Sequence, residues 1–275
     1  MSHEVTSGTG TFVDPGDAGL EQLEELEGLE EFEPLLLLAS ASSGRRATLE
    51  RAGIAFTSRA ADLDEDAVLA GARAAAADGA DGGLSPAEAV LLLAREKAQA
   101  VLEESDGGYV VLGCDSMLEI DGEVVGKPHT PERAAERWRA MRGRTGTLHS
   151  GHWLIDDRDA EDGGTGATLG ATAGCEITFA DLSDEEIEAY VATGEPLGVA
   201  GGFTIDGIGG PFVTSVSGDP HAVVGLSLPL LRELLDEIEV PLHVLWRPDV
   251  AGPAAGPAAS AAPADPGSGA SGTTA

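Results

Sequence analysis

The apolar positions of this chain fall into short runs that alternate with longer periodic stretches. The apolar and β-branched runs predict strands over Leu35–Ala39, Tyr109–Gly113, Met117–Ile120, Glu123–Val125, Leu148–Ile155, Cys175–Phe179, Phe203–Ile205 and Phe212–Ser215. Asp121-Gly122 lies between two of these runs and favours a two-residue hairpin turn. Helical patterns separate most of the strands, and this alternation predicts an α/β fold.

Capping residues mark where the helices begin. Ser85 is followed by Pro86 and then by Glu88, which is the pattern of a capping box at a helix start. Ser183 and Glu186 repeat the same pattern. The predicted helices span Ser43–Ala52, Ser85–Glu104, Thr130–Arg142, Ser183–Gly194 and Leu226–Ile238.

The two ends of the chain differ from its centre in composition. Residues 1–34 carry ten carboxylates and no cation, which predicts a disordered acidic extension. Residues 248–275 are almost entirely Pro, Ala, Gly, Ser and Thr, which predicts a flexible, disordered tail. We therefore expect one folded domain over residues 35–247, with the Gly-rich stretch Asp156–Gly170 as a loop inside it.

Several features favour a cytoplasmic protein. No segment approaches the ~20 apolar residues that span a bilayer, and the acidic N-terminus is unlike a signal peptide. Cys114 and Cys175 are too few for a disulfide framework, so we expect buried free thiols in a reducing compartment. His149 and His152 lie three apart in a predicted strand, which points them to opposite faces and disfavours a shared metal.

The charge of the chain narrows its possible partners. The formal net charge is −32, so duplex nucleic acid would be repelled and is not an expected partner. Arginine is far commoner than lysine, since Lys97 and Lys127 are the only lysines among 16 basic residues. A compact ammonium suits a phosphate oxygen as a point charge, so both lysines are candidates for phosphate contacts.

Three segments place a charge among small residues next to a predicted strand. In Ser40–Arg46 a strand enters a serine-rich turn that opens a helix, and helix N-termini attract anions. The alternative there is an ordinary serine cap with solvated arginines. Asp115 follows an apolar strand, where it either serves a metal or a water molecule or caps a turn. Lys127 follows the hairpin, either as a phosphate ligand or as a surface lysine.

Taken together and in order, these and other short motifs resemble the Maf family of nucleotide pyrophosphatases over roughly residues 35–238. The motifs are Ser40-Ala41-Ser42-Ser43-Gly44-Arg45, Asp64-Glu65, Ala94-Arg95-Glu96-Lys97-Ala98, Cys114-Asp115-Ser116, Asp121–Pro128, Arg142-Gly143-Arg144-Thr145, Leu182–Tyr190, Gly194-Glu195-Pro196-Leu197, Ala200-Gly201-Gly202-Phe203 and Val224-Gly225-Leu226. No single motif is decisive, but their order and spacing are highly specific.

The resemblance implies a two-lobed, inosine-triphosphatase-like α/β fold with a mixed sheet and a long central cleft. It also implies hydrolysis of nucleoside triphosphates to monophosphate and pyrophosphate with Mg²⁺ or Mn²⁺, often by a homodimer. The residues that would bind the substrate phosphates are Ser40, Ser42, Arg45, Lys97 and Lys127. Glu65 and Asp115 would hold the metal, and Asp115 would orient or deprotonate the attacking water. Which carboxylate is the base stays open.

The positions tied to base choice depart from the studied patterns of the family. Gly44, Ser116 and Asp206 occupy these positions here. Ser43 replaces the usual proline of the first motif, and Ala222 replaces an asparagine. The catalytic set is intact, but the base pocket matches neither a dTTP and UTP pattern nor a 7-methyl-GTP pattern. The preferred nucleobase is therefore not assigned.

Two other functions compete with nucleotide hydrolysis. One is a nucleotide-binding regulator of cell division or septum formation that acts through partners, which the acidic N-terminal arm suggests. The other is a phosphatase on small phosphorylated metabolites, which would release orthophosphate in place of pyrophosphate.

Overall fold

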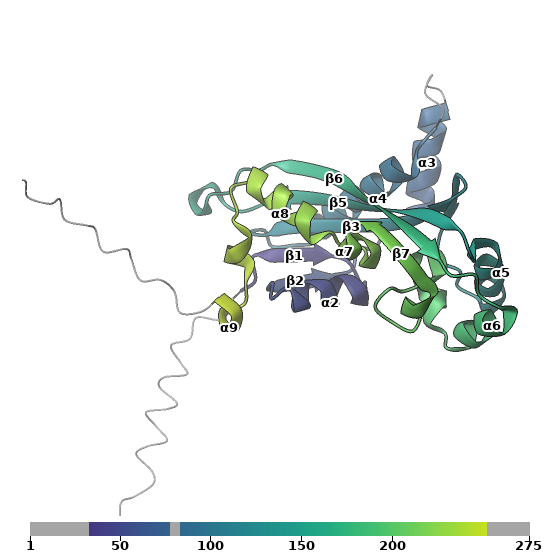
Figure 1. Cartoon of the computed structure of the whole chain (residues 1–275). Helices are drawn as coiled ribbons and strands as arrows, with labels where there is room; N and C mark the ends of the chain where they lie inside the picture. Colours follow the sequence, from purple (N-terminus) through teal and green to yellow (C-terminus); the bar gives the residue numbers. More distant parts are fainter. Residues whose placement is uncertain (1–32, 78–82, 252–275) are drawn as a thin grey trace, which may run out of the picture.

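The computed structural model describes residues 33–77 and 83–251 (Figure 1). In these ranges the chain forms seven strands and eight α-helices. The strands are β1 (Leu36–Ala39), β2 (Phe56–Arg59), β3 (Val110–Ile120), β4 (Glu123–Val125), β5 (Thr145–Asp156), β6 (Thr168–Phe179) and β7 (Val213–Gly218). The helices are α2 (Ser43–Arg51), α3 (Glu65–Ala77), α4 (Pro86–Glu103), α5 (Pro131–Met141), α6 (Asp184–Ala192), α7 (Pro220–Val224), α8 (Leu228–Glu237) and α9 (Pro248–Ala251).

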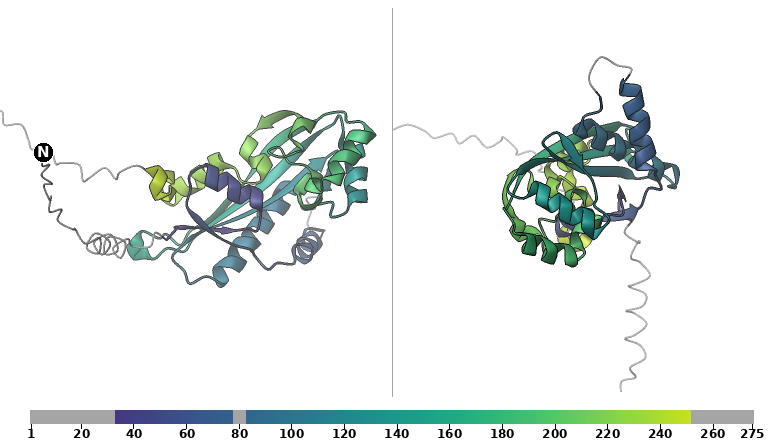
Figure 2. Two further views of the ribbon diagram at one scale, coloured as in Figure 1. Left: turned by 90° about the horizontal axis from the view of Figure 1, so that it is seen from below. Right: turned by 90° about the vertical axis from the view of Figure 1, so that its right-hand side faces the viewer.

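One mixed sheet runs through the molecule in the order β2-β1-β3-β5-β6-β7, and β4 pairs with β3. Strand β1 is parallel to both of its neighbours, whereas β3, β5, β6 and β7 pair antiparallel. The expected mixed α/β sheet is confirmed. In Figures 1 and 2 the long central strands give the molecule an elongated shape, with α8 and α9 near one end and α5 and α6 at the other.

The first lobe is built around β1, whose residues alternate between the two faces of the sheet. Leu36 and Leu38 belong to a hydrophobic core that also holds residues of α2 and α8. Leu37 and Ala39 face the opposite side, against Ala98 and other residues of α4. Helices α2 and α8 therefore cover one face of the sheet, and α4 covers the other.

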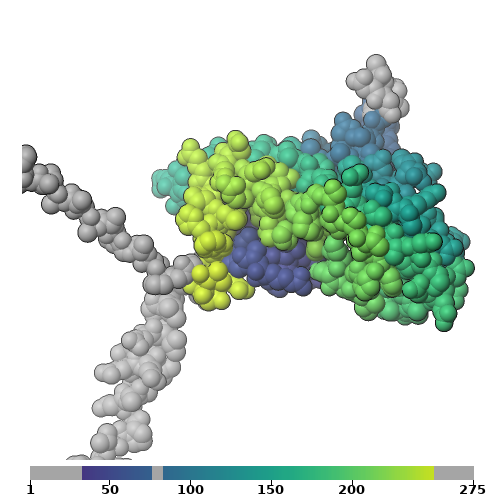
Figure 3. All heavy atoms as spheres, in the orientation of Figure 1, coloured from purple at the N-terminus to yellow at the C-terminus, as the bar shows by residue number. Residues whose placement is uncertain are grey.

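The second lobe surrounds the far ends of β3, β5 and β6. Trp138 of α5 is fully buried there and packs edge to face with Phe179, Tyr190 and Phe212. This aromatic cluster joins α5 and α6 to the sheet in a core distinct from that of the first lobe. The space-filling view shows the purple β1–α2 segment between the yellow C-terminal segment and the green second lobe (Figure 3).

Most predicted element ends agree with the structure because local chemistry sets them. Both capping boxes form, with Ser85 opposite Glu88 and Ser183 opposite Glu186. The hairpin turn forms as expected, since Asp121 and Gly122 both have positive φ and Ile120 pairs with Glu123. Cys114 and Cys175 are free and buried, as predicted.

Three predictions about strands and loops are corrected. The segments predicted separately at Tyr109–Gly113 and Met117–Ile120 form one continuous strand, β3, because β5 pairs with it along nearly its whole length. The predicted loop Asp156–Gly170 is shorter, since β6 already begins at Thr168. The predicted strand Phe203–Ile205 does not form, and the chain there turns instead.

The ends of the predicted domain lie close to the limits of the described residues. The acidic extension at residues 1–34 is outside them except for Glu33 and Pro34. Of the tail at residues 248–275, the structure describes only the helical residues of α9. None of the helices in the described ranges has the length and hydrophobicity that a bilayer-spanning segment needs.

Candidate active site

The site lies where β1 ends and β3 continues past it. The parallel pairing of these strands stops at Ala39 opposite Gly113, after which β1 turns into α2. The serine-rich turn therefore lies beside the next residues of β3, including Asp115. Asp115 was expected at a strand end, but it lies inside β3 and only beyond the end of β1.

Gly113 lets α4 approach this part of β3 very closely. A Cβ atom at position 113 would lie 2.0 Å from the carbonyl oxygen of Ala94. The close contact brings Lys97, one turn further along α4, next to Asp115. Lys97 Nζ lies 2.6 Å from Asp115 Oδ1 and 2.8 Å from Glu65 Oε1.

The Lys97 ammonium bridges two carboxylates of different exposure. The Asp115 side chain is 10% exposed and that of Glu65 is 44% exposed. Burial raises the pKa of Asp115, and the opposing charges of Lys97 and Arg45 do not fully offset it. Burial also acts to raise the pKa of Glu65, but there the contact with Lys97 prevails and the pKa is lowered. Burial therefore dominates at Asp115, and the contact with Lys97 dominates at the more exposed Glu65.

Arg45 is held in place by hydrogen bonds from three of its nitrogens. Nε donates to the carbonyl oxygen of Gly225 (2.9 Å), Nη1 to Ser40 Oγ (3.0 Å) and Nη2 to Ser116 Oγ (3.1 Å). The residue is only 9% exposed, so it is not one of two solvated arginines at a helix start. Three of its five N–H groups are used, which leaves two for a ligand.

The serine hydroxyls of the β1–α2 turn retain donor capacity. Ser40 Oγ accepts from Ser42 N as well as from Arg45, and Ser42 Oγ accepts from Arg45 N. Each hydroxyl keeps its own hydrogen, because neither donates to another described residue. The N–H groups of Ser43 and Gly44 likewise form no hydrogen bond within the described ranges. These donors together suit an anionic oxygen at the start of α2.

Ser116 differs from the other two serines because its hydrogen is already used. Ser150 Oγ donates to the carbonyl oxygen of Ala222 (2.8 Å), so it must accept from Ser116 Oγ at 2.8 Å. Ser116 Oγ in turn accepts from Arg45. The hydrogen bonds therefore run in one direction, from Arg45 through Ser116 and Ser150 to Ala222.

The hydrogen-bond chain from Arg45 through Ser116 to Ser150 predicts that substitutions at the two serines affect nucleotide binding alike. Ser116→Ala removes the acceptor of Arg45 Nη2, and Ser150→Ala removes the acceptor that orients Ser116. Each substitution should raise the KM for a nucleotide about tenfold, because Arg45 is then held less firmly. Ser150 does not line the cavity, so an equal effect there would mark positioning and not ligand contact. Ser116→Thr, which keeps the hydroxyl, should behave like the wild type. Steady-state kinetics of the three variants test this, and a normal KM for Ser150→Ala would contradict it.

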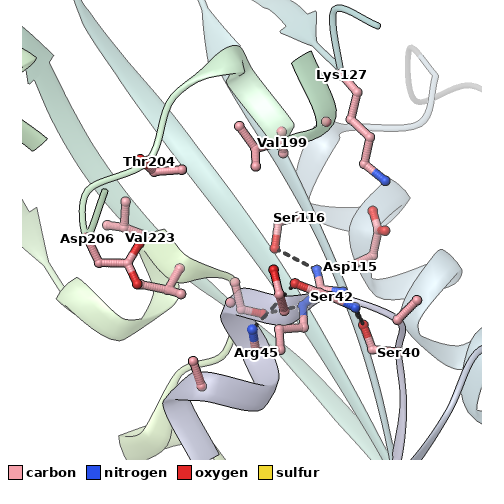
Figure 4. A pocket seen from close by; sticks show the side chains of 18 of the residues that line it. Ser40, Ser42, Arg45, Asp115, Ser116, Lys127, Val199, Thr204, Asp206 and Val223 are labelled. Carbon is pink, nitrogen blue, oxygen red and sulfur yellow. Dashed lines mark hydrogen bonds between the residues drawn. The ribbon is translucent and has the colours of Figure 1, made fainter. Parts of the chain in front are cut away.

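All ten residues proposed from the sequence line one cavity of about 670 Å³, shown in Figure 4: Ser40, Ser42, Gly44, Arg45, Glu65, Lys97, Asp115, Ser116, Lys127 and Asp206. Figure 4 shows Lys127 reaching toward Asp115 from one side, with Asp206 on the other. Lys127 forms no ion pair within the part of the chain that the structure describes. Asp206 pairs with Arg51 of α2 at 3.3 Å.

Sequence reasoning missed other residues of the cavity wall. Glu195, Thr204 and Val199 line it, although the segment around Glu195 was noted only as a matching motif. Nothing in their residue types marks them as functional, because their place depends on how the loop after α6 folds. The apolar Val199 and Val223 supply a hydrophobic part of the wall.

The carboxylates of the site fit a divalent metal of the Mg²⁺ type. No group of three or more His, Cys, Asp or Glu side chains suited to a metal occurs within residues 33–77 and 83–251. Mg²⁺, however, is commonly held by only one or two carboxylates together with substrate phosphates and water. Asp115 Oδ2 accepts no hydrogen bond from the described residues, so it is free to act as one such ligand beside Glu65.

The buried His152 gives the same region a pH-dependent stability. Its Nε2 accepts from Ser227 N (2.8 Å), and its Nδ1 donates to the carbonyl oxygen of Ser150 (3.0 Å). As predicted, His149 faces elsewhere, toward Glu119. Burial lowers the pKa of His152 from 6.5 to about 4.

This pKa difference predicts a loss of stability in mild acid. The unfolded chain binds a proton below pH 6.5, whereas the folded chain does so only near pH 4. The free energy of unfolding should therefore fall by about 3 kcal/mol across that interval from this group. The free energy of unfolding, measured with urea at several pH values between 7.5 and 4.5, should fall more steeply with decreasing pH for the wild type than for His152→Asn. His243→Gln, at an exposed histidine, is the control and should keep the wild-type slope.

Comparison with known proteins identifies the family. A family model described as Maf-like protein matches residues 35–238. The chain belongs to the Maf family. The match spans both lobes and every residue that lines the cavity, and it leaves out the segments at both ends of the chain.

Several Maf-like relatives carry a functional name. A protein of Leifsonia xyli subsp. xyli named nucleoside triphosphate pyrophosphatase is 52% identical over 214 residues, covering 77% of this chain and 96% of the relative. A protein of the same name from Salinispora tropica is 50% identical, covering 77% of this chain and 87% of the relative. One from Nocardia farcinica is 48% identical, with coverages of 77% and 96%.

Proposed function

We propose that this Maf-family protein is a nucleoside triphosphate pyrophosphatase that releases nucleoside monophosphate and pyrophosphate. The observation that carries the proposal is the convergence of Arg45, Lys97 and Lys127 on one cavity. Four carboxylates line the same cavity, and Lys97 is paired with two of them, Glu65 and Asp115. Arg45 and Lys127 form no ion pair within the described residues, so these two cations, with a metal at the carboxylates, favour a polyanionic ligand. The names of the relatives agree with this activity.

Substrate binding would use the two kinds of donor at the site. Ser40, Ser42 and the N-terminus of α2 offer neutral donors, and Arg45 offers its two unused N–H groups. Lys127 would neutralise phosphate oxygens from the opposite side. Phosphoryl transfer depends on such positioning and charge stabilisation more than on covalent help from the protein.

Asp115 would orient the attacking water and take its proton. Its Oδ2 accepts no hydrogen bond from the described residues, and its side chain is the more buried of the two carboxylates, so we assign the role of base to Asp115 and not to Glu65. Water would attack the α-phosphorus, the bond to the bridging oxygen would break, and pyrophosphate would leave. A divalent Mg²⁺ or Mn²⁺, held by Glu65 and Asp115, would supply further charge stabilisation when bound.

Product analysis tests the proposal directly. The purified full chain is incubated with a panel of normal and modified nucleoside triphosphates and Mg²⁺ or Mn²⁺. Monophosphate with pyrophosphate is the expected result, and the ranking of bases would assign the roles of Gly44, Ser116 and Asp206. Orthophosphate release would favour a phosphatase, and nucleotide binding without turnover would favour a regulator.

Two further properties belong to the proposal. The protein would work in the cytoplasm, in keeping with its two free buried thiols. It would also form a homodimer, as the family resemblance implies, and light scattering after size-exclusion chromatography would show twice the mass of the chain.

A further inference from the structure

Glu195 is a half-buried residue of the cavity wall that holds four hydrogen bonds. Its Oε1 accepts from Tyr190 Oη (2.8 Å), Thr204 Oγ1 (2.6 Å) and Gly209 N (2.9 Å), and its Oε2 accepts from Ile208 N (2.9 Å). Three of these bonds are made to Oε1 and one to Oε2, so the protein itself uses most of the acceptor capacity of this carboxylate. Glu195 is therefore poorly suited to contact a ligand, although it lines the cavity.

The loop of residues 204–209 is wrapped tightly around this carboxylate. A Cβ atom at Gly207 would lie 2.6 Å from Glu195 Oε2, and one at Gly209 would lie 2.4 Å from Tyr190 Oη. A larger residue at either position would have to displace the hydroxyl or carboxylate groups that make these contacts.

The same loop forms the side of the cavity away from the cations. Thr204, Ile205, Asp206 and Gly207 line the cavity, and none of them carries a positive charge. Figure 4 shows Thr204 and Asp206 across the cavity from Asp115 and Lys127. A carboxylate at Asp206 would repel phosphates but can accept hydrogen bonds from a nucleobase or a sugar.

We propose that Glu195 is a positioning residue for nucleobase selection, which clamps residues 204–209 and so fixes Asp206 in the cavity wall. This inference rests on the proposed function. The clamp is charged, because the four donors outweigh the effect of burial and keep the pKa of Glu195 lowered. Arg51 adds a weaker, largely exposed contact to Asp206 from α2.

The hydrogen bonds of the clamp can be weakened by replacing one carboxylate oxygen of Glu195 with an amide nitrogen. In Glu195→Gln an amide NH₂ group would face at least one of the loop's own N–H donors, so the loop should loosen. Tyr190→Phe removes one of the four donors and keeps the ring in the aromatic cluster. Glu188→Gln is the matched control, since Glu188 is an exposed carboxylate of α6, the helix that carries Tyr190.

Kinetics over the nucleotide panel give the first readout. For Glu195→Gln the KM of the best substrate should rise about tenfold, and the spread of kcat/KM among bases should shrink. The kcat at saturation should change less than about threefold, because the phosphate end is untouched. Tyr190→Phe should shift KM in the same direction by less, and Glu188→Gln should match the wild type. An unchanged spread of kcat/KM among bases in Glu195→Gln would overturn the proposal, as would an equal fall of kcat for every base.

Hydrogen exchange gives a second readout that does not depend on turnover. The amides of Ile208 and Gly209 should exchange faster in Glu195→Gln than in the wild type, while those of the sheet stay protected. If the wild type hydrolysed no nucleotide, the proposed function would fail, yet this measurement would still test the clamp. Unchanged exchange at both amides would overturn it. Should Glu195→Gln not fold, Tyr190→Phe allows both measurements.

Discussion

Replacing Asp115 with asparagine is expected to lower kcat about a thousandfold, the typical scale for loss of a general base. Asparagine keeps an oxygen that can accept from Lys97, so the contact at 2.6 Å and the fold should persist. It cannot take a proton from water, and it is a weaker metal ligand. The nucleotide KM should change much less than kcat.

The measurement is steady-state turnover with saturating Mg²⁺, together with thermal unfolding of the variant. Asp156→Asn is not a suitable control, because Asp156 anchors Arg158 and Thr165. Glu188→Gln removes an exposed carboxylate and should leave kcat unchanged. A kcat of Asp115→Asn within threefold of the wild type would remove Asp115 from the mechanism.

Replacing Lys97 with methionine should damage both stability and activity. The buried Asp115 would lose its charge partner, and breaking a buried pair in this way typically costs about 3 kcal/mol. Activity should fall at least about a hundredfold, since Lys97 also stands to neutralise phosphate charge. Arg51→Met, which breaks the exposed pair with Asp206, should cost at most about 1 kcal/mol.

A double variant separates the two effects of Lys97. In Lys97→Met with Asp115→Asn the buried position 115 carries no charge, and only the more exposed Glu65 loses a partner. The free energy of unfolding in urea should therefore recover most of the loss. Turnover should not recover, because the double variant lacks both the Lys97 ammonium and the Asp115 carboxylate. Stability losses that simply add in the double variant would show that the two side chains are not coupled.

The elements that were predictable from the sequence are those whose ends depend on neighbouring residues. The capping serines Ser85 and Ser183 and the Asp121-Gly122 turn act within a few residues, and the structure agrees with them. Helix α3 was missed because its sequence is mostly alanine and offers few large apolar residues, and among residues 65–75 only Leu69 is buried. Propensity alone marks such a helix, and the hydrophobic pattern does not.

The candidate site was predictable as a set of residues but not as a geometry. The resemblance to the Maf family placed ten residues, and all ten line one cavity. The support behind them depends on tertiary contacts that no local pattern reveals. Examples are the close approach of Ala94 to Gly113, the hydrogen bond of Ser150 to Ser116, and the hydrogen bonds of Glu195 to its loop.

The placement of Arg45 has a consequence for how the protein is made. Its Nε contact, the carbonyl oxygen of Gly225, lies 180 residues further along the chain. The core beneath it likewise joins Leu36 to Leu231 and Leu245, so β1 has no complete partner surface until those residues have emerged from the ribosome. A nascent chain can form its hairpin and several helices early, but it cannot position this arginine until synthesis is nearly finished. The site can therefore form only after these C-terminal residues have been synthesised. A chain truncated before Gly225 should lack a formed site.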